Sequence, residues 1–577
     1  MDLQIPDTPH TAFVRQASLT PDLPAVIGKD EQLSYAELDQ LSNQIANTLL
    51  ANGIGTGTRV GLLTYRTPRM LAGLLGIVKA GAVYVPVDPE FPADRVRYIL
   101  EHAEVDTLVT ESAVVTDTYP ELFLGGAPLA ALRTVLFVDE SDAGAALAPE
   151  RFPYRQLGRG VLARAPRTLP DVLVRPQDRM VIFYTSGSTG RPKGVALRHD
   201  GMMTRFRWQA DAFGVRPGDR FSQMASCCFD LSMVELFPPL FAGATICMAG
   251  KDVLRNPWAL AEWLTANQIS IVHFVPSMFG EFLRAMREET CSFEHIRWIA
   301  FAGEAIPAPF VRQWIDRYGM HTRLINLYGP TEASVTVSHY LIEARPGDDA
   351  MTIPIGTPHS TDVQMLVVDA EGNRVARGEL GELCIAGVQL ADCYYKAPEL
   401  TQRAFVDNRF ADIAGTRLYR TGDLAREVDD GGYEFHGRMD SQVKVRGYRI
   451  ELGEIEAVLM SHEAVDEAAV IVVDVDGSKR LAAFLSGRTT DLRELKSFLA
   501  RKLNGYMIPN EFLWLDSLPK SSNGKLDRKQ ALAMLESRKP RTLRNAVAGF
   551  CGALWARLFL EIAGASESAL ELSVLVA

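Results

Sequence analysis

The sequence has few cysteines, no excess of positive charge and no long apolar run, and each absence excludes a class of protein. Its seven cysteines among 577 residues form no C-x-x-C pair, which argues against a disulfide framework and a zinc site. The net charge is −11, whereas proteins that bind a nucleic-acid backbone carry a basic surface. We therefore expect reduced thiols and no nucleic-acid partner.

Targeting and membrane segments are also missing from the pattern. Residues 1–10 are polar and contain Pro6 and Pro9, which is not the pattern of a signal peptide. The most apolar stretch, residues 547–565, is interrupted by Arg557 and Glu561, so it predicts a packed helix and not a membrane span. The sequence predicts a cytoplasmic protein with no membrane contact.

The length of the chain predicts at least two domains, because one hydrophobic core rarely serves 577 residues. In the first third, helix and strand signals alternate. Ser34 and Glu37 form a capping box ahead of an apolar helical face. Strands are predicted over 59–65, 82–87 and 107–110, with helices over 70–79 and 94–102 between them. This alternation predicts right-handed crossovers and a parallel sheet, and therefore an α/β fold.

Three further regions differ in composition. Residues 151–170 are rich in Arg, Pro, Gly and Ala, and we expect a solvated surface loop there in preference to an anion site. Residues 361–435 contain short strand patterns and Gly-rich turns, which predict a small β subdomain. A change of composition near 437–440 begins a separate region with helix and strand signals that continues to about residue 535.

A glycine- and hydroxyl-rich loop follows the predicted strand 181–184. It reads Thr185-Ser-Gly-Ser-Thr-Gly-Arg-Pro-Lys-Gly194. Its glycines let backbone N–H groups turn toward an anion, its hydroxyls can donate hydrogen bonds, and Lys193 adds positive charge. The spacing differs from that of a Walker A loop, because the lysine precedes its glycine. A flexible linker is the alternative, but the preceding strand favours a polyphosphate site.

The same string resembles the signature of the adenylate-forming superfamily, which includes acyl-CoA synthetases, luciferases and the adenylation domains of nonribosomal peptide synthetases. Further matching motifs follow in the family's order: residues 33–38, 79–88, 229–232, 326–332, 419–424, 437–447, 448–456 and 523–528. The resemblance covers about residues 10–535, and the chain looks most like a peptide-synthetase adenylation domain.

The resemblance implies a fold and a domain plan. We expect a large N-terminal adenylate-forming domain over 1–438, with parallel-sheet α/β subdomains and a small β-barrel-like subdomain. A smaller, mobile α+β domain would cover 439–535 and would rotate about a hinge at Asp440. After adenylation the rotation would exchange the Lys525 face for the Val443–Gly447 face. Residues 536–577 would form a tail.

The resemblance also implies an ATP site, in which cations and donors must offset the negative charge of a polyphosphate meeting a carboxylate. Glu332 would bind Mg²⁺, Thr331 would donate to phosphate, and Lys525 would be the main catalytic residue. Tyr328 would cover adenine, and Asp423 would accept the ribose hydroxyls beside Arg438. The remaining nucleotide-binding residues would be Thr185, Ser186, Gly187, Ser188, Thr189, Gly190, Lys193, Gly303, Asn326 and Gly329.

A substrate pocket follows from the family's specificity positions. These fall on Asp230, Leu231, Val234, His273, Ala300, Ala302, Leu327, Val335, Thr336 and Lys525. Asp230 would hold the α-ammonium of an amino acid, and Lys525 its carboxylate. A plain acid would leave Asp230 buried and unpaired, at a cost of about 3–5 kcal/mol, which favours amino acids.

The rest of the predicted pocket is apolar apart from His273 and Thr336. Without a buried counter-charge, a Lys, Arg, Asp or Glu side chain is not expected. We predict a small, neutral, hydrogen-bonding side chain: serine, or a diaminopropionate or ureidoalanine derivative, with alanine or threonine next. His273 could equally be a wall residue without a role in selection. The alternative functions are an acyl- or aryl-CoA ligase and a catalytically silent nucleotide-binding protein.

The acceptor of the activated group would be the phosphopantetheine thiol of a peptidyl carrier protein, in biosynthesis of an antibiotic-like peptide. Residues 559–572 resemble the attachment region of a carrier, with Ser566 at the modified position. Ala565 and Glu567 depart from that pattern, so a degenerate carrier or an amphipathic tail is equally compatible. The motifs begin near Met1, which predicts a stand-alone activator or a first module. A small MbtH-like helper is a further partner that the resemblance implies.

Overall fold

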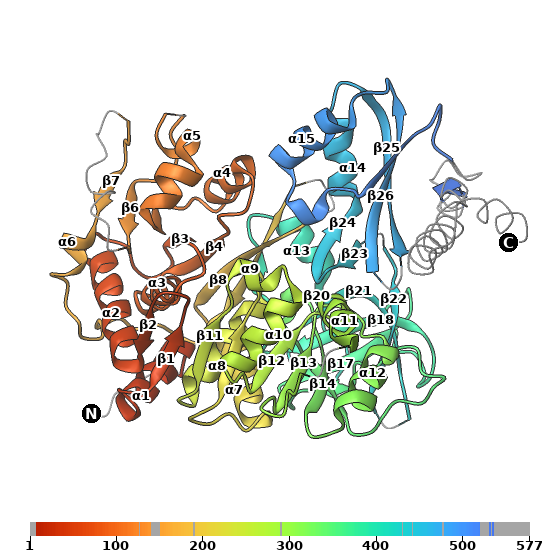
Figure 1. The fold of residues 1–577 in the computed structure, drawn as a ribbon, viewed down its shortest axis with the longest axis horizontal. Coiled ribbons are helices and arrows are strands. Elements are labelled where there is room, and N and C mark those ends of the chain that lie inside the picture. The colour runs from red at the N-terminus through yellow and green to blue at the C-terminus, as the bar shows by residue number, and fades with distance from the viewer. Residues whose placement is uncertain are drawn as a thin grey trace, which may run out of the picture.

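The computed structural model describes residues 7–125, 127–139, 151–187, 191–288, 291–429, 431–440, 442–475, 478–519, 530–531 and 534–535. Figure 1 shows the chain running from the N-terminal elements on the left, through the central sheet, to the C-terminal elements at the upper right. Within the described residues, no helix is both long and apolar enough to cross a membrane.

The N-terminal part is built on an eight-stranded sheet with the order β19-β9-β8-β4-β3-β5-β6-β7. Parallel β3, β4 and β5 are joined by helices, which confirms the predicted parallel sheet. The strands are β3 (Arg59–Leu63), β4 (Val83–Val87), β5 (Thr107–Thr110), β6 (Thr134–Phe137), β7 (Arg155–Leu157), β8 (Arg179–Thr185), β9 (Lys193–Arg198) and β19 (Cys393–Tyr394).

Helices of this part are α1 (Pro9–Leu19), α2 (Tyr35–Ala51), α3 (Pro68–Lys79), α4 (Ala93–His102), α5 (Pro120–Phe123) and α6 (Arg159–Leu162). The predicted capping box is present at the start of α2. Ser34 Oγ accepts from the Glu37 backbone N–H, and the Glu37 carboxylate accepts from the Ser34 N–H. Two of the otherwise unpaired donors at this helix end are thereby satisfied.

A nine-stranded sheet follows, with the order β16-β15-β14-β13-β12-β10-β11-β1-β2. β10 to β14 are parallel, so their carboxyl ends meet at one edge of the sheet. The strands are β1 (Pro24–Ile27), β2 (Gln32–Ser34), β10 (Arg220–Gln223), β11 (Thr245–Met248), β12 (Ile271–Phe274), β13 (Trp298–Phe301), β14 (Arg323–Tyr328), β15 (Ser338–Ile342) and β16 (Thr357–Pro358).

Helices along this second sheet are α7 (His199–Ala212), α8 (Leu231–Phe241), α9 (Lys251–Leu254), α10 (Pro257–Ala266), α11 (Pro276–Ala285) and α12 (Ala308–Tyr318). They pack on its faces in the central part of Figure 1. One apolar cluster joins the α7–α8 region with the first sheet, and a second lies between α10, α11, α12 and the parallel strands. These cores fix the strand ends from which the site is built.

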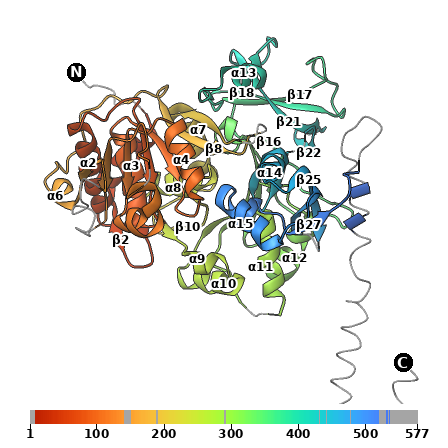
Figure 2. The ribbon, with the colours of Figure 1, turned by 90° about the horizontal axis from the view of Figure 1, so that it is seen from above.

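The predicted β subdomain is an antiparallel five-stranded sheet, with β22 paired to β21 beside the path β17-β18-β21-β20. It lies at the top of the view in Figure 2 with α13 (Pro398–Ala404). Its described ladders form an open path. The strands are β17 (Val363–Val368), β18 (Gly381–Gly387), β20 (Phe405–Asp407), β21 (Arg417–Glu427) and β22 (Tyr433–Arg438).

The C-terminal elements begin with a hairpin of β23 (Gln442–Val445) and β24 (Tyr448–Glu451). A three-stranded sheet of β25 (Val465–Val475), β26 (Ser478–Gly487) and β27 (Glu511–Trp514) follows, with helices α14 (Leu452–Met460) and α15 (Leu492–Lys502). Their separate apolar core includes Ile455, Val470 and Leu499. The boundary after residue 438 and the tail after 535 stay predictions.

A buried ion pair and a half-buried aromatic contact tie the C-terminal elements to the rest of the chain. Arg95 on α4 pairs with Glu454 on α14 at 3.0 Å, and both side chains are almost fully buried. The Tyr448 ring lies 4.6 Å from the ring of Phe229 and is stacked at 3.8 Å on the ring of Tyr506. These contacts position the β23–β24 hairpin over the carboxyl edge of the second sheet.

The loop predicted over 151–170 is only partly a loop. Residues 155–157 form β7, which pairs in parallel with β6, and residues 159–162 form α6. Buried Phe152, Leu157 and Leu162 provide the apolar contacts that hold this segment against the sheet. The five arginines of the segment are all exposed, as expected of a solvated surface.

Candidate functional site

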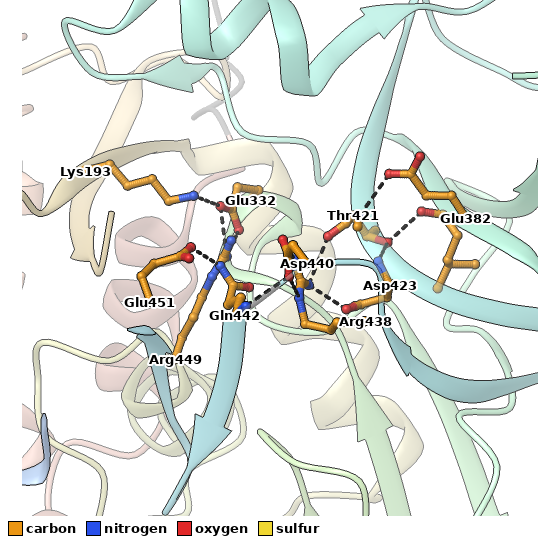
Figure 3. A network of polar contacts seen from close by, with 12 residues as sticks. Lys193, Glu332, Glu382, Thr421, Asp423, Arg438, Asp440, Gln442, Arg449 and Glu451 are labelled. Carbon is orange, nitrogen blue, oxygen red and sulfur yellow. Dashed lines mark hydrogen bonds and ion pairs between the residues drawn. The ribbon is translucent and has the colours of Figure 1, made fainter. Parts of the chain in front are cut away.

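The centre of the site is the buried carboxylate of Glu332. It lies in a 3₁₀ turn (Thr331–Ala333) that follows β14, at the carboxyl edge of the parallel strands. Arg449 NH1 lies 2.9 Å from Oε1 and 2.7 Å from Oε2, and Lys193 Nζ lies 3.3 Å from Oε1. Burial opposes ionisation, but the Arg449 and Lys193 charges outweigh it and hold the pKa of Glu332 well below its usual range. Figure 3 shows the three side chains converging.

Tyr394 completes the shell around Glu332. Its hydroxyl donates to Glu332 Oε1 at 2.6 Å, and Lys193 Nζ lies 4.5 Å from the centre of its ring. The position is fixed because β19 pairs with β9, the strand that begins at Lys193. Sequence reasoning missed Tyr394, because it lies between the matching motifs 326–332 and 419–424 and belongs to neither.

A second charged group, where a ribose site is predicted, lies at the paired positions of Asp423 within β21 and Arg438 at the end of β22. The Tyr328 hydroxyl donates to Asp423 Oδ2 at 2.5 Å, and Arg438 NH1 donates to Asp423 Oδ1 at 2.5 Å. Arg438 also forms a two-bond ion pair with Asp440, at 2.7 and 2.6 Å. The structure therefore brings together the residues predicted for adenine, ribose and hinge, as Figure 3 shows for Asp423, Arg438 and Asp440.

The phosphate loop begins at the end of β8 and is described up to Gly187. Thr185 Oγ1 is buried without a hydrogen-bond partner among the described residues, which suits it to donate to an anion. Ser186 Oγ donates to the backbone carbonyl of Arg449 at 2.8 Å, which links this loop to the C-terminal hairpin. Ser188, Thr189 and Gly190 lie outside the described residues.

The tip of the β23–β24 hairpin reaches the carboxyl edge of the second sheet. Gly447 N donates to Glu304 Oε1 at 2.9 Å, and a Cβ on Gly447 would lie 2.7 Å from Val275. Its φ of +78° also favours glycine. Gly303 lies directly opposite. The structure thus places the Val443–Gly447 face at the site; Lys525 and Ser566 lie outside the described residues.

Asp230, the predicted ammonium ligand, lies at the N-terminal end of α8. Its side chain is hydrogen-bonded to that of Thr331, which places it one residue from Glu332. Burial raises the pKa of Asp230, although Thr331 and the charge of Lys444 act in the opposite direction. Among the residues that the structure describes, no lysine or arginine nitrogen lies within 4.0 Å of its carboxylate.

The predicted side-chain pocket gathers around the ends of β12, β13 and β14. His273 is paired with Ala300 across β12 and β13, and both ring nitrogens of His273 are buried without a partner. Most of the remaining pocket residues share one apolar cluster: Ala300, Ala302 and Leu327, with Leu231 packed against it. Val234 is buried on α8.

Two further predicted residues shape the backbone of this pocket. Val335 and the preceding Ser334 adopt φ values of +78° and +56°, which are uncommon for residues other than glycine. Gly329 approaches the Thr336 backbone so closely that a Cβ would lie 2.3 Å from the Thr336 Cα.

Asn326 was predicted to bind nucleotide, but its amide donates to the Pro354 carbonyl at 2.7 Å. Its described contact is therefore structural.

Arg205 and Arg449 are two charged groups of this site to which the sequence assigned no role. Arg205, on α7, is not one of the predicted pocket residues. Its Nε donates to Thr336 Oγ1 at 2.5 Å. Arg449 belongs to a matching motif, but its contact with Glu332 depends on where the hairpin packs. The sequence could have indicated Arg449 by its charge within a matching motif. The helical pattern around Arg205 gave no indication of a functional role.

Comparison with known proteins agrees with this geometry. Residues 13–395 match the AMP-binding enzyme family, and residues 454–525 match the AMP-binding enzyme C-terminal domain. Zwittermicin A synthase ZmaJ of Bacillus cereus is 36% identical over 533 residues, which cover 91% of this chain and 95% of that protein. Tyrocidine synthase 3 of Brevibacillus parabrevis is 36% identical over 562 residues, 95% of this chain but only 8% of that much longer protein.

Among solved structures, an artificially fused adenylation–PCP di-domain from Klebsiella oxytoca, NpsA-ThdA, has a TM-score of 0.74 and 24% identity. The match covers 88% of this chain and 94% of that one, and it confirms the α/β fold with a large N-terminal and a small C-terminal part. The buried carboxylate between two cations, the hydroxyl-rich loop and the matched families lead to one conclusion: the chain belongs to the AMP-binding enzymes.

Proposed function

We propose that the chain activates an amino acid with ATP to an aminoacyl-AMP, with release of pyrophosphate. The aminoacyl group would then pass to the phosphopantetheine thiol of a peptidyl carrier protein in nonribosomal peptide biosynthesis. The similarity to tyrocidine synthase 3, to zwittermicin A synthase ZmaJ and to an adenylation–PCP structure of an NRPS supports this reading. The chain spans only 8% of one of these relatives, so the acceptor and the product are proposals.

The observation that carries the amino-acid assignment is Asp230, which is half-buried at the end of α8. A carboxylate at the site with a hydrogen bond to Thr331, and without a described cation within 4.0 Å, suits the α-ammonium group of a substrate. An uncharged acyl or aryl group would leave this carboxylate buried and unpaired, at a cost of about 3–5 kcal/mol. The arrangement thus favours an amino acid over the acids that a CoA ligase would use.

The nucleotide end of the site suits a polyphosphate. The substrate carboxylate is ionised at neutral pH, so it needs no general base to attack phosphorus. Lys193, the buried Thr185 hydroxyl and the catalytic Lys525 would offset the charge that develops on the phosphate oxygens. Tyr328 and Asp423 would position the adenosine, with Arg438 holding the Asp423 carboxylate.

Glu332 is a suitable Mg²⁺ ligand, since Mg²⁺ sites that hold phosphates use one or two carboxylates. No group of three or more His, Cys, Asp or Glu side chains suited to a metal occurs among the described residues, so phosphate oxygens would supply the other ligands. Mg²⁺ would neutralise part of the polyphosphate charge when bound. Both Glu332 oxygens contact Arg449 here, so Arg449 and a metal ion would compete for this carboxylate.

Amino-acid-dependent exchange of pyrophosphate into ATP tests the proposal and separates it from its alternatives. We expect exchange with at least one amino acid, and a loss of about 100-fold or more in Asp230→Ala, which follows from the cost of losing the ammonium ligand. Exchange driven only by non-amino acids, with transfer to coenzyme A, would favour an acyl- or aryl-CoA ligase. ATP binding without exchange under any condition would favour a silent nucleotide-binding protein.

The apolar wall around His273 supports a small, neutral, hydrogen-bonding side chain. We propose serine, or a diaminopropionate or ureidoalanine derivative, with alanine or threonine next. A panel of amino acids in the exchange assay decides among them. A preference of tenfold or more, about 1.4 kcal/mol, for tryptophan, lysine or glutamate would contradict this pocket while leaving adenylation intact. An MbtH-like protein is a further proposed partner, tested by whether its co-expression raises the exchange rate.

A further inference from the structure

A buried cation lies behind the wall of the proposed side-chain pocket. Arg205, in the middle of α7, has no solvent exposure. Its Nε donates to Thr336 Oγ1 at 2.5 Å, and NH2 donates to Gln209 Oε1 at 2.9 Å. Gln209 in turn donates to the Val234 carbonyl at 2.9 Å, so the guanidinium is connected to two residues of the predicted pocket.

This cation has no acidic partner among the described residues. No carboxylate oxygen there lies within 4.0 Å of the guanidinium, and NH1 is buried without any hydrogen-bond partner. The ring of Trp208, 4.9 Å from the guanidinium carbon, is a weak substitute for an anion. Buried charges are normally paired, so an unpartnered guanidinium nitrogen beside a ligand pocket indicates a missing acceptor.

The Thr336 hydroxyl is not free to bind a substrate side chain, because it already has two hydrogen-bond partners in the protein. Thr336 Oγ1 accepts from Arg205 Nε and lies 3.0 Å from Nε2 of His359, to which its proton can be donated. The hydroxyl predicted to contact the substrate is therefore engaged on the far side of the wall. Arg205 NH1 and His273 remain as the polar groups near the pocket that lack partners.

The positive charge of Arg205 acts on its neighbours as well. Burial, reinforced by the Arg205 charge, lowers the pKa of His273 to about 3, so this imidazole is neutral at pH 7. Burial, and to a smaller extent the Arg205 charge, also lower the pKa values of His339 and His359. The titratable groups around Arg205 are thus kept neutral, and none of them offsets its charge.

We propose that Arg205 determines specificity: it selects an amino acid whose side chain ends in an oxygen acceptor and rejects one that ends in an ammonium group. The inference rests on the proposed amino-acid adenylation and narrows its substrate class. Serine and ureidoalanine derivatives fit it, because each offers an oxygen to a donor. Diaminopropionate does not, since its ammonium would be a second cation in the same water-poor pocket.

The test compares side chains of equal length that differ in their terminal group. Pyrophosphate exchange is measured with serine against 2,3-diaminopropionate, and with homoserine against 2,4-diaminobutyrate. The wild-type enzyme is expected to prefer the hydroxyl member of the better pair by at least about tenfold in kcat/KM. Thr336→Asp places a carboxylate beside Arg205 and should lower that ratio at least about tenfold. Thr336→Asn, which has a similar shape without the charge, measures how much of that change is due to shape.

The outcomes separate the role of Arg205 from the proposed function. A wild-type preference for an ammonium side chain, or for alanine by tenfold over every hydroxyl side chain, would overturn the role of Arg205 alone. Equal shifts in Thr336→Asp and Thr336→Asn would do the same, because shape and not charge would then set the ratio. No exchange with any amino acid would instead overturn adenylation itself.

Discussion

Arg449 NH1 contacts both carboxylate oxygens of Glu332, at 2.9 and 2.7 Å, although the two residues are 117 positions apart in the chain. The contact exists because the β23–β24 hairpin reaches across to the end of β14. It uses the carboxylate that we propose as the Mg²⁺ ligand during adenylation. The C-terminal hairpin and the metal would therefore occupy Glu332 at different stages of the reaction.

Replacing Arg449 should separate the two half-reactions. In Arg449→Met we expect pyrophosphate exchange within about threefold of wild type, because adenylation does not use this contact. Thioester formation should fall by roughly 10- to 100-fold, equivalent to about 1.4–2.8 kcal/mol. Both are measured with the same carrier protein. Arg403→Met, an exposed arginine on α13, is the control. Equal loss of both half-reactions in Arg449→Met would argue that the residue serves stability alone.

The buried Glu235 on α8 gives a prediction about pH. Its Oε2 accepts from the backbone N–H groups of Met224 and Ala225, which fixes the turn that leads to Asp230. Burial raises the pKa of Glu235 to about 8. Between its unfolded pKa near 4.5 and this value the folded chain binds more protons than the unfolded chain, so stability falls as the pH rises through this window.

We expect Glu235→Gln to remove this dependence. Relative to the variant, the free energy of unfolding of wild type should fall by up to about 1.4 kcal/mol per pH unit between pH 5 and 8. Above pH 8 it should fall little further. Denaturant unfolding of both proteins at several pH values measures the difference, in which the other titrating groups cancel. Glu281→Gln, at an exposed position of α11, is the control. Parallel curves for wild type and Glu235→Gln would contradict a raised pKa.

Asp440 offers a test of the proposed hinge. Its carboxylate is held by Arg438 through two hydrogen bonds, at the junction between β22 and the C-terminal hairpin. Proline would fix φ at this point and restrict rotation. Asp440→Pro should therefore retain one half-reaction and lose the other. Asp440→Ala, which removes the bonds of the carboxylate to Arg438 and to the Gln442 N–H but leaves φ free, should retain both within about tenfold. Equal losses in Asp440→Pro with unchanged stability would count against rotation.

Much of this architecture could be predicted, because its causes are local. The capping box at Ser34 and Glu37, the strand–helix alternation and the phosphate loop depend on residues within a few positions of one another. The family resemblance predicted the roles of the residues around Glu332 and Asp423, because their motifs follow one another in the family's order. Their convergence in the structure agrees with it.

The contacts that sequence reasoning missed are all long-range. Arg205 meets Thr336 across 131 positions, and Tyr394 meets Glu332 across 62. Neither pairing leaves a periodic or local signal, since each depends on how α7 or β19 packs. For the same reason the pocket was judged to lack a buried counter-charge. Arg205 is a buried cation behind that wall, and our inference is that it disfavours side chains ending in an ammonium group.

The tail can be tested by direct chemistry. If Ser566 belongs to a working carrier, incubation with a phosphopantetheinyl transferase and coenzyme A should add one phosphopantetheine group to the full chain. Intact mass measures this, and Ser566→Ala should abolish the gain, whereas Ser568→Ala should keep it. An unmodified chain would assign the acceptor to a separate carrier protein, which the thioester assay can then identify.

The final prediction concerns Lys525, whose proposed task is to contact the substrate carboxylate and the α-phosphate while negative charge develops on the oxygens. A cation that acts mainly in the transition state lowers the barrier without contributing much to ground-state binding. Lys525→Ala should therefore reduce the kcat of pyrophosphate exchange by about 100-fold or more, the usual effect of removing such a donor, with a small change in KM. Lys520→Ala, in the same segment, should stay near wild type.

A second measurement distinguishes catalysis from folding. In the described arrangement Arg449 engages Glu332, and we expect transfer from a preformed aminoacyl-adenylate to the carrier thiol not to need Lys525. We expect Lys525→Ala to perform this transfer within about threefold of wild type, with an unchanged unfolding midpoint. Near-normal exchange in Lys525→Ala would remove the residue from the catalytic set. Parallel losses of exchange and transfer would mean that Lys525 supports the structure of the C-terminal part and not the adenylation step.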